Sequence, residues 1–444
     1  MNQLFELLGF LIVLIQLYRW LYRMWLQRWM NRKKSVKLPR KPRVLKPKTE
    51  HDCPVCQQHK SKATPPAQLL PIAWSTRKGR GGPRKKISTQ GFACPNPLCE
   101  DHGIRDEAIH ALVGDGTHGK HAAIQDLKCQ ACGKKFTVRR NTLMYRLKHS
   151  PDTVARDLWL LALGVDISAL EEVFKVRELT IRTWLARSGV QSMKIHERFM
   201  VQLDLLHLQL DELWASVKFG GHDLWVWVVS DATTKLVPVL QVGSRSQEKA
   251  YRVVHELKRR LRSDSTPVFA SDGLKHYFYA LTAHFGQWEP GQGKKPVWVL
   301  LSQFAYAQVI KHQRRRRTVK VERRLLWGDE QSYRSRLKQA GLSGRINTSF
   351  VERINLTIRQ SVSKLTRRTW GPAHYSPELL EHLEWWRCYY HFARYHDSLA
   401  VELSHPIQRK GRQQPLRYRR RTPAMAAGLT TRRWSVSELI SYPV

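Results

Sequence analysis

The sequence predicts a multidomain protein of mixed α and β structure, and three observations lead to this prediction. The chain has 444 residues, enough for roughly two to four domains. Six of its seven cysteines form close pairs in the first third of the chain. From about residue 203 onward, apolar residues alternate with polar ones, as they do in half-buried strands. We therefore expect a cysteine-rich region and a helical region, followed by an α/β domain.

The chain is strongly basic. It has 76 lysine and arginine residues against 36 aspartate and glutamate residues, a formal net charge of +40. Its hydrophobic content of 42% excludes a wholly disordered chain. Surfaces that serve only solubility usually mix both signs of charge, so we expect a nucleic acid partner, bound less tightly as salt rises. The basic residues concentrate at 32–48, 77–86, 311–324 and 409–421.

Residues 1–31 are predicted to form a hydrophobic and then amphipathic helix. The uncharged, mostly apolar run from Leu7 to Tyr18 is shorter than the roughly 20 residues that a membrane-spanning helix needs. Arginines then follow among aromatic residues at helical spacing. A helix for a partner or for self-association, a weak membrane contact and a disordered start are the open interpretations. Residues 32–49 are a basic, proline-rich linker.

The cysteine-rich region 50–145 is predicted to bind zinc. Cys129 and Cys132, followed by a glycine and then a phenylalanine, have the spacing of a zinc knuckle, with two thiolates on a tight turn. Cys94 and Cys99 are the natural second pair for a tetrahedral site of four thiolates. Such a site supplies much of the folding free energy of a small domain. The alternative is that these cysteines are reduced and bind nothing.

The remaining cysteines and one histidine leave alternatives open. Paired cysteines in a reducing compartment indicate metal ligands before disulfides. Cys53 and Cys56 either form a second zinc site with a nearby histidine or bind no metal. His102 is an alternative ligand of the first site, and Cys388, in an aromatic helical run, is predicted to be a core residue.

Residues 150–196 are predicted to form a helix-turn-helix from three short helices. The first starts at a Ser-Pro pair and stops at Gly164, and a capping box opens the second. The third is expected to end at Gly189, and it displays Arg182 and Arg187. In a helix-turn-helix these arginines would enter the major groove of DNA. Three short helices also occur in other α-rich domains, which is the alternative.

Residues 203–400 are predicted to form a catalytic α/β domain. Three strands in hairpin connection are followed by a helix, a buried strand and a second helix, expected at 206–211, 224–230, 236–242, 246–261, 267–271 and 275–285. This β-β-β-α-β-α order is the core of a ribonuclease-H-like fold. The fold class is thus multidomain α+β, with a zinc ribbon and a helix-turn-helix before a ribonuclease-H-like domain. Residues 287–344 are interpreted as a basic insertion, and 401–444 as a basic C-terminal tail.

Three acidic residues in this domain are the candidate catalytic residues. Asp211 lies inside a strand, Asp272 at the end of another, and Glu352 on a helix. Carboxylate oxygens are the ligands that Mg²⁺ prefers, and two divalent ions held about 4 Å apart can cut phosphodiester bonds. A solvated strand face, an ordinary turn and a helix-surface pair are the alternatives, and Asp204 and Glu212 are weaker substitutes for Asp211.

Basic residues follow Glu352 along the chain and are predicted to bind DNA. Arg359 comes seven residues later, so it lies on the same helix face about 10 Å away. This position suits a side chain that holds a phosphate near the acidic site. Lys364, Arg367 and Arg368 continue the basic run.

Four segments resemble the DDE transposases of bacterial insertion sequences: QLDELWASV, WVWVVSDATTKLV, FASDG and NTSFVERINLTIRQSVSKLTRRTW. They are most similar to the family typified by insertion sequence one and its relatives. The cysteine pairs and the helical segment after them resemble the front half of such proteins. The resemblance covers roughly residues 94–400. Two features depart from the family pattern, the long basic interval from Asp272 to Glu352 and the N-terminal helix.

The resemblance implies cutting and joining of DNA at the ends of a mobile element. Asp211, Asp272 and Glu352 would be the triad that binds Mg²⁺ or Mn²⁺, and Arg359 matches a basic residue found seven positions beyond the glutamate in many such enzymes. The implied partners are double-stranded DNA of the element ends and target, and further copies in a homo-oligomer. The implied location is cytoplasmic, at the nucleoid. The alternatives are a non-catalytic regulator derived from a transposase and a membrane-associated scaffold.

Overall fold

The computed structural model describes residues 73–77, 87–119, 123–219, 223–291, 295–315, 317–366, 373–408, 411 and 414–444. Several predicted features lie outside these residues: the helix at 1–31, the linker at 32–49, Cys53, Cys56, Arg367 and Arg368. No helix within the described ranges is both long enough and apolar enough to cross a membrane.

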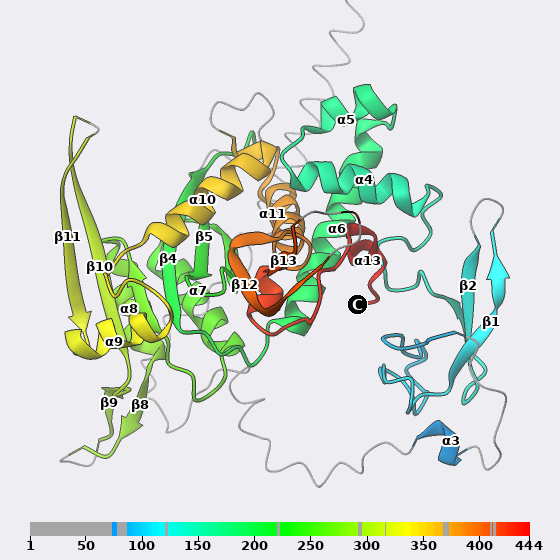
Figure 1. The fold of residues 1–444 in the computed structure, drawn as a ribbon, viewed down its shortest axis with the longest axis horizontal. Coiled ribbons are helices and arrows are strands. Elements are labelled where there is room, and N and C mark those ends of the chain that lie inside the picture. Colours follow the sequence, from blue (N-terminus) through cyan, green and yellow to red (C-terminus); the bar gives the residue numbers. More distant parts are fainter. Residues whose placement is uncertain are drawn as a thin grey trace, which may run out of the picture. The chain divides into compact units, whose positions relative to one another are not determined.

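The centre of the fold is a six-stranded mixed sheet in the order β11-β10-β7-β4-β5-β6 (Figure 1). β4, β5 and β6 pair as antiparallel neighbours, whereas β7 runs parallel to both β4 and β10. β11 returns antiparallel along β10 and forms one edge. The mixed α/β structure is therefore confirmed. The strands are β4 (His207–Ala215), β5 (Leu224–Asp231), β6 (Val239–Gly243), β7 (Val268–Ser271), β10 (Ala305–Arg314) and β11 (Arg317–Trp327).

Helices cover both faces of this sheet. Because successive side chains of a strand point to opposite faces, β4 contributes to two cores. Leu208 and Leu210 pack with α7 and α8, and Leu213 packs with α10 and α11 on the other face. Asp211 is two residues from Leu213, so its side chain lies on the same face of β4 and faces α10. Glu212 lies on the opposite face, toward α8. The covering helices are α7 (Gln247–Arg260), α8 (Lys275–His284), α10 (Ser349–Ser361) and α11 (Ser376–Phe392).

Much of the expected basic insertion at 287–344 belongs to the sheet itself. β10 pairs with β7 in parallel register, and α9 packs Tyr333 and Leu337 against β7 and β10. The sequence does not predict β10 because Ala305 to Val309 is buried continuously, as parallel strands covered on both faces are, and so shows no alternation. The other elements here are β8 (Gly286–Glu289), β9 (Val297–Leu300) and α9 (Glu330–Gln339).

Three helices precede the sheet, as predicted, but the third is longer than expected. α6 continues past Gly189 to Phe199, so the prediction that it ends at Gly189 is wrong. A Cβ atom at Gly189 would lie only 2.5 Å from the Cα atom of Glu381 on α11. The glycine therefore costs about 1 kcal/mol of helix propensity and in return lets two helices pack closely. The helices are α4 (Pro151–Ala162), α5 (Ile167–Phe174) and α6 (Glu178–Phe199).

The residues interpreted as a basic tail fold back onto these helices. Trp434, Leu439 and Ile440 belong to the same hydrophobic core as α4 and α6. Nε2 of Gln191 on α6 donates a hydrogen bond to the backbone oxygen of Leu439 at 2.7 Å. The C-terminal elements are β12 (His396–Ile407), β13 (Leu416–Arg421), α12 (Pro423–Ala426) and α13 (Val436–Ser441).

The cysteine-rich region forms a small antiparallel sheet of three strands in the order β1-β2-β3. The turn between β2 and β3 carries Cys129 and Cys132, and Gly133 adopts a φ of +74° there. This left-handed conformation strongly favours glycine, in agreement with the knuckle spacing in the sequence. The elements are α3 (Trp74–Arg77), β1 (Leu112–His118), β2 (Ile124–Cys129) and β3 (Lys135–Thr137).

Candidate active site

The acidic site lies where β7 ends beside the middle of β4. The two strands run parallel, with Leu210 opposite Ser271, so Asp211 and Asp272 follow at the same level. Carboxylate oxygens of Asp211, Glu212 and Asp272 all lie within 4.8 Å of one another. Such a group could hold a metal ion. The structure thus brings two of the three predicted acids together and adds Glu212.

Hydrogen-bond donors fix both aspartates. Asp211 accepts from the backbone N–H of Glu212 at 2.9 Å and from Nδ2 of Asn355 on α10 at 2.8 Å. Oδ1 of Asp272 accepts from the backbone N–H of Leu274 at 3.0 Å. Oδ1 of Asn355 is buried and has no hydrogen-bond donor among the described residues. A bound cation, or a water on that cation, would satisfy this oxygen, so the donor set fits a metal ion.

Glu212 reaches the site from the opposite face of β4. Its buried carboxylate pairs with Nη2 of Arg245 at 2.5 Å and accepts from Oη of Tyr277 at 2.9 Å. Burial and the charge of Asp272 raise the pKa of Glu212, against the opposing effect of Arg245. From the sequence alone, Glu212 is predicted only as a weaker substitute for Asp211. Neighbouring residues of a strand face opposite sides, so the Asp-Glu pair alone does not predict that both approach Asp272.

Protons compete with a metal ion at Asp211. Burial, and then the neighbouring carboxylate of Asp272, raise the pKa of Asp211 to about 7. A metal ion binds the ionised carboxylate, so its affinity falls as the pH drops through this value. We expect Mn²⁺ to bind about tenfold more weakly at pH 6 than at pH 8, as measured by the electron paramagnetic resonance of free Mn²⁺. Equal affinities at the two pH values would contradict the raised pKa.

Glu352 is held by another partner. Nζ of Lys311 on β10 lies 2.6 Å from both of its carboxylate oxygens, and Oγ1 of Thr348 donates to Oε1 at 2.6 Å. Glu352 is close enough to Asp211 for its charge to contribute to the raised pKa of Asp211. It is not part of the group of three carboxylates around Asp272. A metal ion that uses Glu352 would therefore compete with the ammonium group of Lys311 for this carboxylate.

Replacing Lys311 by methionine is expected to tighten metal binding. The substitution removes a cation that competes for Glu352, and a half-exposed ion pair of this kind contributes up to about 1 kcal/mol, equivalent to about fivefold in affinity. Mn²⁺ titration of the protein without DNA measures this effect. The control Lys338→Met removes the same charge from the exposed surface of α9 and should change the affinity little. Equal effects of the two substitutions would show that Lys311 acts only through net charge.

Three of the basic residues predicted to bind DNA have partners within the protein. Arg182 on α6 pairs with Glu378 of α11, and Nζ of Lys364 lies 2.5 Å from Oε1 of the same glutamate. Arg359 donates from Nη2 to the backbone oxygen of Trp214 at 3.3 Å. These contacts position the three cations, and their binding to DNA stays a prediction.

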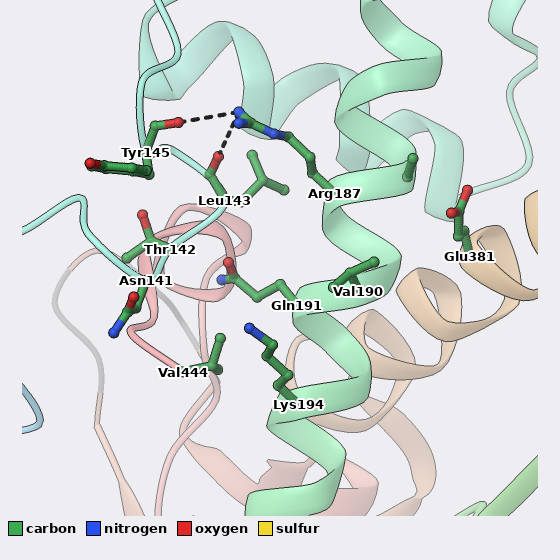
Figure 2. Close-up of a pocket in the computed structure, with 11 residues that line it drawn as sticks. Asn141, Thr142, Leu143, Tyr145, Arg187, Val190, Gln191, Lys194, Glu381 and Val444 are labelled. Carbon is green, nitrogen blue, oxygen red and sulfur yellow. Dashed lines mark hydrogen bonds between the residues drawn. The ribbon is translucent and has the colours of Figure 1, made fainter. Parts of the chain in front are cut away.

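Arg187 lies in a pocket between α6 and the segment that follows β3 (Figure 2). Nη1 donates to the backbone oxygens of Tyr145 at 3.2 Å and Leu143 at 3.5 Å. The pocket has a volume of about 370 Å³, and Gln191 and Lys194 also line it. Arg187 therefore joins this segment to α6, a structural contact that its position in the sequence does not reveal. Its predicted contact with DNA is not tested by this arrangement.

The four cysteines predicted to bind zinc come together. Sγ of Cys94 lies 3.5 Å from Sγ of Cys132, and Sγ of Cys99 lies 3.8 Å from Sγ of Cys129. All four sulfur atoms lie within 4.8 Å of one another, so the cluster could hold a metal ion. His102 directs its Nδ1 atom to the backbone oxygen of Cys94 at 2.9 Å. His102 therefore lies beside the cluster, and its hydrogen bond helps to hold the backbone at Cys94 in place.

The described residues offer two groups of side chains that could bind metal ions: four cysteines, and three carboxylates that include two of the predicted acids. Cysteine sulfurs and carboxylate oxygens suit different ions, so the two groups serve different chemistry. Comparison with known protein families finds no matching family model, and comparison with curated proteins finds no match.

Proposed function

We propose that the protein is a DDE-type transposase, which cuts DNA at the ends of a mobile element and joins those ends to target DNA. The observation that carries the proposal is the side-by-side placement of Asp211 and Asp272 on parallel strands. Glu352 lies one helical turn before Asn355, which binds Asp211. Three carboxylates on two strands and a helix are what the resemblance to these enzymes implies.

The sheet supports a ribonuclease-H-like catalytic domain. Reading from one edge, β6-β5-β4-β7-β10 places three antiparallel strands before two parallel ones, with helices on both faces. This is the sheet expected from the β-β-β-α-β-α order of the sequence once β10 is added. β11 extends the same sheet by one antiparallel strand.

The acidic residues would hold the ions for phosphodiester chemistry. When bound, two Mg²⁺ or Mn²⁺ ions activate the attacking hydroxyl group and stabilise the leaving oxygen. Asp211 and Asp272 would hold these ions, and Asn355 and the neighbouring backbone N–H groups fix the orientation of the two carboxylates. Glu352 would join these ligands in competition with Lys311, its present partner.

The remaining modules would recognise DNA. Tetrahedral zinc with sulfur at about 2.3 Å places its sulfur atoms about 3.8 Å apart, and the Cys99–Cys129 distance is 3.8 Å. Tetrahedral sites of four thiolates hold zinc or iron, and we assign zinc here because the Cys129–Cys132 spacing is that of a zinc knuckle. The zinc region and helices α4 to α6 would bind the element ends, and the charge of +40 favours a polyanionic partner. Two ends must be held together, so we expect a homo-oligomer.

A supercoiled plasmid that carries the gene with its natural flanking DNA tests the proposal. The full chain is incubated with the plasmid and Mg²⁺, and the 3′ ends of the products are mapped. Specific cleavage at the flanks is the expected result. DNA binding without cleavage under any divalent ion would instead favour a non-catalytic regulator.

A further inference from the structure

Residues of the β12–β13 hairpin (Figure 1) and of the chain that follows it line a large basic groove. Its volume of about 1210 Å³ exceeds the roughly 300–1,000 Å³ of pockets for small molecules. The groove therefore has room for a segment of a polymer. Five arginines line it: Arg417, Arg419, Arg420, Arg432 and Arg433.

Few carboxylates balance these arginines. Asp397 is the only acidic residue among those that line the groove, and its Oδ1 atom lies 3.9 Å from Arg420. Arg432 pairs with Glu438 at 2.6 Å. Arg419 and Arg433 each donate to a backbone oxygen, which orients the guanidinium group, and neither forms an ion pair with a carboxylate of the described residues. The groove thus carries net positive charge on side chains held in place, which suits an anionic occupant.

Two exposed tyrosines stand among the arginines. Tyr418 on β13 is 52% exposed and Tyr395 is 37% exposed. The guanidinium carbon of Arg433 lies 4.9 Å from the centre of the Tyr395 ring. Exposed aromatic rings beside arginines bind single-stranded nucleic acid, because unpaired bases stack on the rings while arginines contact the phosphates. A duplex keeps its base faces inside, so it would use the arginines and leave the tyrosines without a partner.

We infer that this groove binds single-stranded DNA, with Tyr395 and Tyr418 stacking on bases and the arginines contacting the backbone. The groove shares no residue with the carboxylate group around Asp272 or with the cysteine cluster. Binding in it does not depend on the proposed strand cleavage. A protein that failed to cut DNA could still bind a single strand here. A protein that cut DNA could equally fail to bind a single strand in this groove.

The test measures binding of the full chain to fluorescein-labelled dT20 and to a labelled 20-base-pair duplex by fluorescence anisotropy across a salt series. The groove variant is Arg417→Gln/Arg420→Gln. The matched control, Arg252→Gln/Arg334→Gln, removes two positive charges from exposed positions on α7 and α9. Tyr418→Ala, which keeps every charge, tests stacking in a second way. Equal melting temperatures establish that each variant is folded.

We expect the groove variant to bind dT20 about tenfold more weakly, and the control less than about twofold. The slope of log K against log salt should fall by about 1.4 for the groove variant, since each phosphate contact to a single strand contributes about 0.7. Tyr418→Ala should weaken dT20 binding at least about fivefold and leave duplex binding unchanged. Equal losses in the groove and control variants would overturn the inference. A loss confined to the duplex would also overturn it.

Discussion

Replacing Asp272 by asparagine is expected to lower Mg²⁺-dependent cleavage of the flanking DNA by about 1000-fold or more. The substitution removes the negative charge of one of the two aspartates that we propose hold the catalytic ions. A loss of about 4 kcal/mol of transition-state stabilisation corresponds to this factor. DNA binding should persist, because we propose that it rests on basic residues and on modules outside the acidic site. Nicking of the plasmid and a parallel gel-shift measurement separate the two effects.

The matched control for this substitution is Asp264→Asn. Asp264 lies in the same domain, on an exposed loop, where it pairs with Arg262. The Asp264→Asn variant should cleave the plasmid at the rate of the unmodified protein. Cleavage retained by Asp272→Asn would remove Asp272 from the catalytic centre, and equal loss in both variants would point to a defect in folding.

Replacing Cys129 by serine is expected to release zinc from the protein. Cys129 is fully buried, with its sulfur 3.8 Å from that of Cys99, and serine is a poor zinc ligand. Structural zinc sites contribute about 10–16 kcal/mol to small domains, so residues 87–145 should unfold locally. The zinc content measured by atomic emission should fall by about one ion per chain, and binding to the element ends should weaken.

Cys388→Ala is the control for the cysteine cluster. Cys388 is a buried thiol in the core around α6 and α11, as the sequence predicts, and it belongs to no group of metal-binding side chains among the described residues. Its replacement should leave the zinc content unchanged. An unchanged zinc content in Cys129→Ser would contradict the four-thiolate site.

Local patterns in the sequence predict much of the fold and the cysteine cluster. Alternation of apolar and polar residues from Leu206 to Asp211 predicts β4. The run LWVWVVS after a Gly-Gly turn predicts β5, because aromatic and β-branched residues bounded by a turn favour a strand. Cysteine spacing and Gly133 locate the turn between β2 and β3. The strand-end position of Asp272 and the strand position of Asp211 predict their meeting, because β4 and β7 are parallel neighbours.

Contacts between distant parts of the chain could not be predicted in the same way. Glu352 and Lys311 are 41 residues apart, and their pair depends on how α10 lies over β10. The first half of β10, from Ala305 to Val309, is buried continuously and so carries no alternating signal. Gly189 is a helix terminator by propensity, and only the proximity of α11 explains why α6 runs through it. Each of these features is set by tertiary packing, which local propensity does not record.

Locating a bound ion tests the central claim most directly. Crystals of the full chain, soaked in Mn²⁺ at pH 8, would show the ion by its anomalous scattering. We predict a peak about 2.0–2.3 Å from carboxylate oxygens of both Asp211 and Asp272, absent in crystals of Asp272→Asn. A protein that binds Mn²⁺ elsewhere, with no peak between these two aspartates, would contradict the account.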